Sequence, residues 1–327
     1  MNKLTMKNLL RIILLLLLLT APGSAMASQL KGDINGDGRV NIADVSALID
    51  FMLSNSADTV QMAVYDMNND GFVNIADVSC LIDALLNPTE PIPTTDVVLT
   101  VNGVSFTMVL VDGGQFVMGA TDEQQDVAGR NEYPAHEVTL WSYYIGQTEV
   151  TQELWEAVMG ENPSGFTGDP KRPVENVNLF DCAKFVDLLT ELTGKTFRMP
   201  TEAEWEFAAR GGNMSRHYRY AGGDVAGIVA WCETNAGGMT HAVALKAPNE
   251  LGLYDMSGNV CEWCQDWYTL YDAAPQTNPV GPESGTDNVY RGGSWLSHDA
   301  ECRVSSRYNL NPHEKSLDLG LRIVMNY

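Results

Sequence analysis

Residues 198–210 read Arg-Met-Pro-Thr-Glu-Ala-Glu-Trp-Glu-Phe-Ala-Ala-Arg, a stretch that shows how the larger part of the chain begins to fold. Thr201, followed three residues later by Glu204, forms a capping box, in which each side chain accepts a backbone N–H that the first helical turn leaves unpaired. The helix is expected to run to about Arg210. This stretch therefore predicts a short helix with a sharply defined start.

Around this helix the sequence mixes other short helices with β-branched runs. One helix is predicted from Thr151 to Met159, and another is capped by Asn178 and closed by Gly194. The runs from Val97 to Val101 and from Ser105 to Val111 are typical of strands. Beyond the capping-box helix the chain is rich in Gly, Asn and Trp and predicts short strands at best. The expected fold is α+β and irregular, with its functional site on loops.

Length and charge limit the classes of function. At 327 residues the chain is about twice the usual length of one domain, so two folded units are expected. The 20 basic and 42 acidic residues give a net charge of −22. A protein that tracks nucleic-acid phosphates needs a positive surface, so a nucleic-acid partner is excluded.

The N-terminus has the parts of an export signal. Lys3, Lys7 and Arg11 precede the apolar run Ile12 to Leu19, and a small-residue site ends at Ala27. This order predicts a signal peptide over residues 1–27 and a secreted, extracellular or periplasmic, mature protein. The apolar run is well short of the roughly 20 residues that span a bilayer, so no membrane span is expected.

Residues 28–88 contain two copies of one loop pattern, 33 residues apart. Each copy places oxygen-bearing side chains at loop positions 1, 3, 5, 9 and 12 and a Gly at position 6, as Ca²⁺ loops do, and a backbone carbonyl is expected from Arg39 and from Val73. Two bound Ca²⁺ ions are predicted. The ligands are Asp33, Asn35, Asp37, Arg39, Asn41 and Asp44 in the first loop and Asp66, Asn68, Asp70, Val73, Asn74 and Asp77 in the second.

A single amphipathic helix is expected after each loop, because apolar residues recur at i, i+3, i+4 and i+7. Those residues are Val45, Leu48, Ile49 and Met52 in the first helix and Val78, Leu81, Ile82 and Leu85 in the second. Two such helices can cover each other's apolar stripe. With Asp at position 12 of both loops, residues 28–88 resemble a small all-α type I dockerin. The resemblance implies a cohesin-type partner for this module.

A linker and a second domain follow. Residues 89–97 are rich in proline, which is typical of a semi-rigid spacer, and the second domain is expected over residues 98–327. Five motifs occur there in a fixed order: Gly114–Gly119, Glu149–Thr151, Arg198–Arg210, Asn249–Asn259 and Arg291–Trp295. In that order they resemble the formylglycine-generating enzyme family, also called sulfatase-modifying factors. The resemblance implies an irregular fold related to C-type lectin-like domains.

The resemblance also implies a chemistry. Members of the family oxidise a cysteine of a sulfatase polypeptide to formylglycine, using O₂ and a Cu⁺ ion held by two thiolates. Here Ser297 stands at the position of the first cysteine, and a hydroxyl is a poor ligand for Cu⁺. Cys302 stands at the second position, but alignment of Arg303–Arg307 with the next family motif moves it away from that position. A buried or disulfide-bonded Cys302, with Cys264 as one candidate partner, is the alternative.

Three functions follow from these observations. The first is a secreted protein that is non-catalytic or altered in chemistry and whose loops bind a ligand or protein. The second is an active oxidase that acts on a sulfatase, and only this function requires Cu⁺ at Cys302 and the position of Ser297. The third is an assembly component of a cell-surface complex that handles polysaccharide.

One family metal site transfers to this sequence. The resemblance implies one Ca²⁺ held by the side chains of Asp255 and Glu262 and the carbonyls of Gly258 and Val260, a donor set that suits a hard cation. Other metal patterns are weak. The five histidines form no paired motif for a transition metal, and the Cys261-Glu-Trp-Cys264 spacing occurs once, without a second pair.

Overall fold

The computed structural model describes Ile34, Tyr65, Met67 and residues 42–54, 73–86, 95–124 and 126–326. Contacts within the chain divide it into two units, Met1–Pro93 and Thr94–Tyr327, each of which is considered by itself. The predicted signal peptide and most of the predicted linker lie outside the described residues. Among the described residues, no helix combines the length and the apolar character needed to cross a bilayer.

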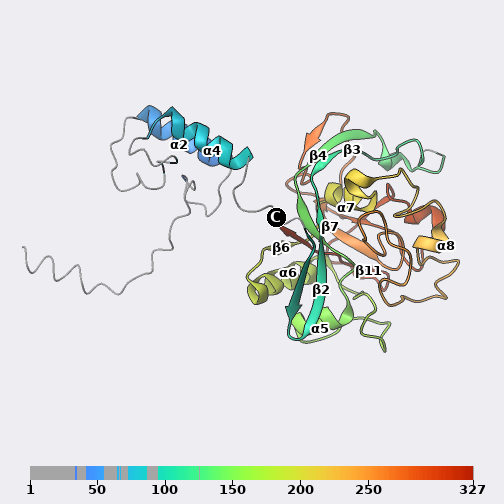
Figure 1. Ribbon diagram of the computed structural model, residues 1–327. Coiled ribbons are helices and arrows are strands. Elements are labelled where there is room, and N and C mark those ends of the chain that lie inside the picture. The colour runs from blue at the N-terminus through green and yellow to red at the C-terminus, as the bar shows by residue number, and fades with distance from the viewer. Residues whose placement is uncertain are drawn as a thin grey trace, which may run out of the picture. The chain divides into compact units, whose positions relative to one another are not determined.

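The first unit contains two helices, α2 (Ile42–Ser54) and α4 (Ile75–Leu86), which lie side by side (Figure 1). As the periodicity predicts, each helix buries its i and i+3 apolar residues. The core consists of Ile34, Val45, Leu48, Tyr65, Val78 and Leu81. Ile49 is 39% exposed and Ile82 is 38% exposed. Each helix covers only part of the other's apolar stripe, so the i+4 residues stay partly exposed.

Three sheets form the framework of the second unit. The largest is antiparallel, with strand order β1-β2-β5-β12-β6: β1 (Val97–Val101), β2 (Val104–Val111), β5 (Tyr143–Gly146), β12 (Val324–Asn326) and β6 (Phe197–Arg198). The second has the order β10-β9-β7-β11: β10 (Arg307–Leu310), β9 (Asn288–Arg291), β7 (Cys261–Trp267) and β11 (Leu319–Gly320). The third has the order β3-β4-β8: β3 (Gly114–Met118), β4 (His136–Leu140) and β8 (Gln276–Thr277).

The predicted helices begin where their caps place them. The Thr151 hydroxyl accepts the Leu154 N–H at the start of α5 (Gln152–Met159). Asn178 caps α6 (Leu179–Thr193), and Thr201 with Glu204 closes the capping box of α7 (Glu202–Ala209). Short helical segments complete the unit: α8 (Ala226–Val229), η1 (Arg130–Glu132), η2 (Gly212–Met214) and η3 (Asp299–Cys302). Short helices with three curled sheets confirm the α+β prediction.

The helices pack into two hydrophobic cores. In the first, α5 and α6 lie against β1 and β2, and Trp155 stacks on Phe185 with ring centroids 4.8 Å apart. In the second, α7 lies near β3 and β7 (Figure 1) and also contacts β9. It contributes the buried Trp205 and Phe207 to this core. The helix of the capping box is thus buried on all sides, and its polar residues must find partners inside the domain.

Candidate functional site

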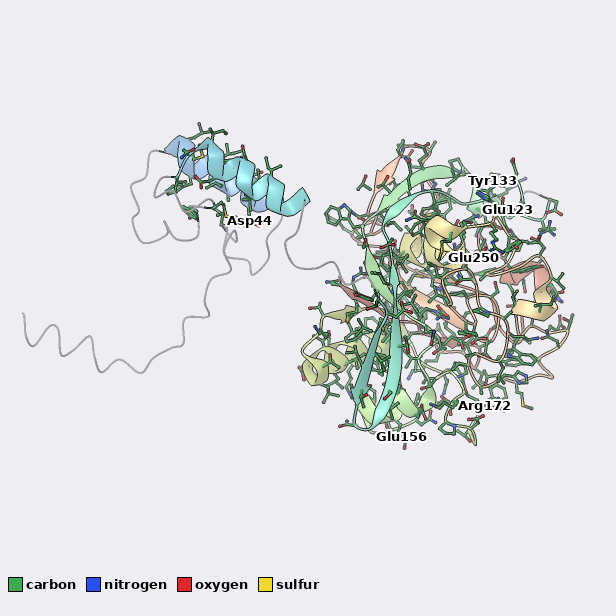
Figure 2. The ribbon with its side chains drawn as sticks, in the orientation of Figure 1. Asp44, Glu123, Tyr133, Glu156, Arg172 and Glu250 are labelled. Carbon is green, nitrogen blue, oxygen red and sulfur yellow. The ribbon has the colours of Figure 1, made fainter. Side chains whose placement is uncertain are left out.

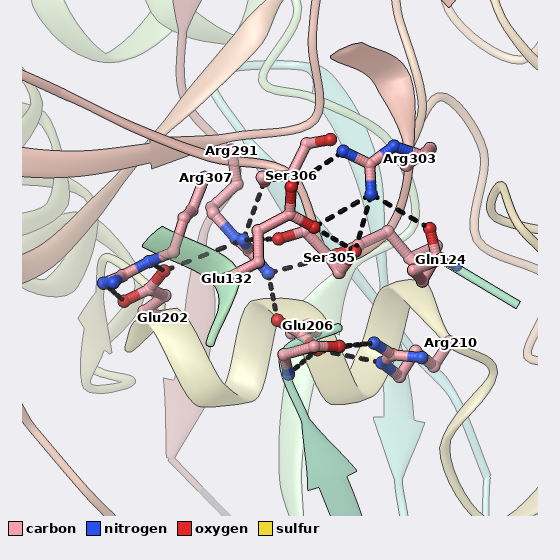
Figure 3. A network of polar contacts seen from close by, with 12 residues as sticks. Gln124, Glu132, Glu202, Glu206, Arg210, Arg291, Arg303, Ser305, Ser306 and Arg307 are labelled. Atoms are coloured by element: carbon pink, nitrogen blue, oxygen red, sulfur yellow. Dashed lines mark hydrogen bonds and ion pairs between the residues drawn. The ribbon is translucent and has the colours of Figure 1, made fainter. Parts of the chain in front are cut away.

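The polar residues of α7 take part in a buried network of ion pairs (Figure 3). Glu206 is fully buried and accepts hydrogen bonds from Arg291, from Arg210 at 2.9 Å and from the Gly119 N–H at 2.8 Å. Arg291 also donates to three carbonyls of the segment after η3, those of Val304, Ser305 and Ser306. One carboxylate therefore joins motifs that lie far apart in the sequence.

Two further buried ion pairs extend this network. Arg307 forms a two-pronged ion pair with Glu202 at 2.7 and 2.6 Å, and Arg303 forms one with Glu132 at 2.8 and 2.7 Å. All four side chains are at most 6% exposed. The two arginines and two glutamates hydrogen-bond each other inside the domain. They therefore act as a scaffold that positions the loops.

Ser297 lies in the loop between β9 and η3. Its hydroxyl accepts the Ser294 N–H at 3.1 Å and lies 3.3 Å from the Ser294 hydroxyl, which in turn donates to Asp318 at 2.9 Å. Its carbonyl accepts the Glu233 N–H. The serine therefore stabilises a turn, and its oxygen is tied to that turn.

Cys302 lies at the end of η3 and is fully buried. Burial raises the pKa of its thiol well above the usual range. A Cβ added at Gly293 would lie 2.7 Å from its Sγ, so the backbone of the preceding turn covers the sulfur. Cys232 belongs to the same small cluster of buried side chains, and its Sγ lies 3.1 Å from Asp299. The thiol at this position is enclosed by protein.

No disulfide joins the cysteines that the structure describes. Cys302 and Cys264 are both free, and Cys264 belongs to a different hydrophobic core. The disulfide alternative for Cys302 is therefore wrong for this structure, and the buried alternative describes it. Packing explains this: η3 turns Cys302 toward Tyr220 and Cys232, whereas β7 holds Cys264 against α7.

The predicted calcium residues of the second unit lie next to two charged groups for which the sequence predicts no role at this site, Glu149 and Arg322. Asp255 Oδ2 accepts the Ala244 N–H at 2.7 Å, whereas its Oδ1 is buried and has no hydrogen-bond partner. Glu262 is engaged on both oxygens, by Arg322 at 2.8–3.0 Å and by the Trp205 Nε1–H at 2.6 Å. Of the two predicted carboxylate ligands, Asp255 is therefore the one that keeps a buried oxygen without a hydrogen-bond partner.

Electrostatics at this cluster is unfavourable for a third negative charge. Burial raises the pKa of Glu149 well above its ordinary value, and the nearby Asp255 and Glu262 raise it further. Burial also raises the pKa of Asp255 to about 6. The carboxyl groups of Glu149, Asp255 and Glu262 thus lie near a single guanidinium group, that of Arg322. Within residues 95–124 and 126–326, no three acidic, histidine or cysteine side chains converge closely enough to form a metal cage.

In the first unit the structure describes four of the predicted calcium ligands, Asp44, Val73, Asn74 and Asp77. Asp44 and Asp77, the last predicted ligands of the two loops, are fully buried in the first turns of α2 and α4. Figure 2 labels Asp44. Asp44 accepts the Ile34 N–H, and Asp77 accepts the Asn74 N–H, both at 2.8 Å. The other predicted ligands lie outside the described residues: Asp33, Asn35, Asp37, Arg39, Asn41, Asp66, Asn68 and Asp70.

The repeat itself corrects one predicted ligand. An offset of 33 pairs Arg39 with Phe72, so the pattern predicts that the backbone carbonyl of the second loop comes from Phe72, which lies outside the described residues. Val73 lies one residue further along the loop, at the position equivalent to Val40.

Comparison with known proteins gives two domain families. Residues 100–327 match the sulfatase-modifying factor enzyme 1-like domain, and residues 31–86 match the dockerin type I domain. The chain is 32% identical over 271 residues to a protein of Paenibacillus barcinonensis named chaperone protein LppX, an alignment that covers 68% of this chain and 90% of that protein. It is 38% identical over 177 residues to the formylglycine-generating enzyme of Streptomyces coelicolor, covering 49% of this chain and 54% of the enzyme.

Solved structures with the same fold include Treponema denticola variable protein 1 and PvdO from Pseudomonas aeruginosa. The first superposes with a TM-score of 0.65 at 35% identity and covers 71% of this chain and 99% of that chain. The second superposes with a TM-score of 0.62 at 25% identity and covers 72% and 99%, respectively. The irregular fold is thus one that known structures share over almost their whole length.

Proposed function

Because the chain belongs to the sulfatase-modifying factor enzyme 1-like family and carries a type I dockerin domain, we propose that it is a secreted binding protein without oxidase activity, attached through its dockerin to a cohesin-type partner. The enclosure of Cys302, with a serine in place of the other thiol, carries this proposal. Residues 1–27 would be removed on export.

The donors at the position of the family's copper site do not fit Cu⁺. This ion prefers soft thiolate ligands. Ser297 offers a hard oxygen that already takes part in hydrogen bonds with Ser294. Cys302 offers a thiol whose raised pKa disfavours the thiolate and whose sulfur is covered by the Gly293 turn. No oxidation step is therefore derived for this chain.

The name of one relative suggests polypeptide binding for the large domain. A relative named a chaperone protein aligns over 90% of its own length. The domain presents its loops on a scaffold of buried ion pairs, and rigidly supported loops are common binding surfaces. We propose that these loops hold a polypeptide without modifying it.

Copper binding tests this proposal directly. We expect the reduced full-length protein, titrated with Cu⁺ against a competing chelator, to show no stoichiometric tight binding that depends on Cys302. We also expect no aldehyde in a C-x-P-x-R peptide incubated with the protein and O₂, measured by mass spectrometry. Ser297→Cys should remain inactive, because the second thiol stays enclosed.

Cys302→Ser is the matched control, since it reports whether any bound copper is at this position. Tight binding of one Cu⁺ that Cys302→Ser abolishes, together with aldehyde formation by the unmodified sequence, would overturn the proposal and establish the oxidase alternative.

Calcium is proposed at two places. The dockerin loops would bind two Ca²⁺ ions, with Asp44 and Asp77 as their last ligands. In the large domain, Asp255 Oδ1 would contribute one ligand together with the carbonyls of Gly258 and Val260. The buried oxygen without a partner supports this site. Glu262 would contribute only by giving up one of its hydrogen bonds from Arg322 or Trp205.

Chelation should open the first unit. Without Ca²⁺ the loop carboxylates repel one another, so we expect EDTA to increase deuterium uptake in α2 and α4 of the full chain, measured by hydrogen-exchange mass spectrometry. Asp44→Asn and Asp77→Asn should have the same effect in saturating Ca²⁺. Asp50→Asn, on the exposed side of α2, is the control. Uptake that is indifferent to EDTA would contradict the calcium assignment.

A cohesin pull-down tests the partner. Capture of the full chain by a cohesin-bearing protein of the same organism should depend on Ca²⁺ and be lost in Asp77→Asn. Failure against every cohesin that the organism encodes would remove this part of the proposal.

A further inference from the structure

A cavity of about 420 Å³ opens beside the N-terminus of α7. Its walls come from β3, β4 and the end of β7, from the loop that follows β7, and from β10. Neither Ser297 nor Cys302 lines it. Its polar lining residues include His136, Glu202, Asp266, Tyr271, Asp272 and Arg307. The cavity is therefore separate from the family's reactive position.

Two nearly buried side chains present unpaired atoms to this cavity. His136 and Asp266 are each 5% exposed. His136 Nδ1 lies 3.2 Å from the Pro134 carbonyl, which can only accept, so in the neutral ring Nε2 is the acceptor. Asp266 Oδ2 accepts the Glu202 N–H at 3.0 Å, and its Oδ1 has no hydrogen-bond partner among residues 95–124 and 126–326. Both residues line the cavity, and neither atom is among the completely buried atoms that lack a partner, so each keeps some exposed surface for a ligand.

The strongest donor beside the cavity is already occupied. Arg307 donates to both oxygens of Glu202 and to the carbonyls of Asn131 and Thr269. The Tyr271 hydroxyl donates to the same Glu202 carboxylate at 3.1 Å. An anionic ligand would therefore find no free cation here, whereas a cationic ligand would find two free acceptors.

The rest of the wall is suited to an aliphatic chain. Met118 is buried in the cavity wall, and Leu270 and Val280, which also line it, are 68% and 61% exposed. Exposed apolar side chains beside polar acceptors are typical of sites that take an amphipathic ligand.

We propose that this cavity binds a primary alkylammonium group, which donates to Asp266 Oδ1 and His136 Nε2 while its aliphatic stem covers Leu270 and Val280. An ammonium group has three donors and no acceptor, so it complements this pair of atoms. The site does not depend on the function proposed for the loops.

Protonation of Asp266 makes binding depend on pH. Burial raises the pKa of Asp266 to about 8, Glu202 and Glu204 raise it further, and Arg307 lowers it. At neutral pH the carboxyl group is therefore mostly protonated, and an ammonium ligand must release that proton. Affinity should rise by about tenfold per pH unit up to pH 8. The charged groups that act on the pKa of Asp266 are Glu202 and Glu204 from α7 and Arg307 from β10. The other titratable groups that line the cavity are His136 from β4 and Tyr271 and Asp272 from the loop after β7.

Calorimetric titration of the full chain with hexylammonium chloride is the test. We expect one site whose binding heat changes with the ionisation enthalpy of the buffer, because a proton is released. Hexan-1-ol, which has the same stem and no charge, should bind at least tenfold more weakly. Equal binding of hexylammonium and hexan-1-ol, or no binding at all, would overturn the proposal.

Two variants test whether Asp266 Oδ1 and His136 Nε2 accept hydrogen bonds from the ligand. Asp266→Asn can still accept the Glu202 N–H but turns the free acceptor into an amide donor, so affinity should fall at least tenfold and the dependence on buffer should disappear. His136→Phe keeps a ring against Tyr271, whose centroid lies 4.8 Å away, but lacks Nε2, so affinity should also fall. Asp187→Asn, on the exposed side of α6, should bind as the unmodified protein does.

The melting temperature of each variant shows whether it is folded. If Asp266→Asn does not fold, His136→Phe decides the question. A folded variant of either residue that binds hexylammonium as tightly as Asp187→Asn would overturn the proposal.

Discussion

Glu206→Gln should destabilise the large domain by about 3–5 kcal/mol, the cost of breaking a buried ion pair by removing one partner. The glutamine amide could still fill the space, but Arg291 and Arg210 would lose their shared carboxylate while remaining buried. Urea unfolding followed by tryptophan fluorescence measures the change. All seven tryptophans lie beyond residue 140, so this signal reports only on the large domain.

Glu156→Gln is the matched control for this prediction. Glu156 lies on the exposed side of α5 and takes no part in the network (Figure 2). Surface substitutions of this kind usually change stability by less than about 0.5 kcal/mol. If both variants lost a similar small amount, the buried network would contribute little and another feature would hold the loops together.

The buried network also explains what the family motifs report. Glu206 comes from the capping-box motif, Arg291 begins the Arg-Gly-Gly-Ser motif, and Gly119 ends the first motif, yet all three meet at one carboxylate. These residues maintain the fold whether or not a copper site exists. A match across the motifs therefore establishes the scaffold, whereas the proposal that the chain lacks oxidase activity rests on Ser297 and Cys302.

Local features of the fold could be predicted because their physics is local. The caps at Thr151, Asn178 and Thr201 act within three residues, and the helices begin there. The order of the strands could not be predicted in this way. β12, at the end of the chain, lies between β5 and β6, and β11 pairs in parallel with β7. These contacts join residues far apart in the sequence, which short-range patterns do not encode.

The same distinction applies to the sites. Each predicted calcium loop spans 12 residues, so its ligands could be predicted from spacing alone. His136 and Asp266 lie 130 residues apart and share a cavity only after folding. Glu149 was read only as part of a short motif, although it belongs to the buried carboxyl cluster of Asp255. Their importance depends on the burial of their side chains and on their neighbours in the folded chain, which the sequence does not give.

Asp255 should make the stability of the metal-free large domain decrease as the pH rises. Its pKa is about 6 in the folded protein and near 3.8 when unfolded, so between these values the folded state binds more protons. The contribution is fully present below about pH 4 and is lost as the pH rises through 6, a loss on the order of 3 kcal/mol. Asp255→Asn should remove this part of the pH dependence, measured in EDTA by urea unfolding at pH 4.5 and 7.5.

Bound Ca²⁺ should reverse the effect, because a divalent cation beside Asp255 favours the ionised carboxylate that burial disfavours. At pH 7.5, Ca²⁺ should therefore stabilise the unmodified large domain and leave Asp255→Asn unchanged. Asp266, whose pKa is also raised, adds its own slope in both proteins and cancels in the difference, which reports on Asp255 together with the Glu149 carboxyl whose pKa Asp255 raises. Equal slopes in EDTA would show that Asp255 is already ionised in the folded protein, and stabilisation of both proteins by Ca²⁺ would place the ion elsewhere.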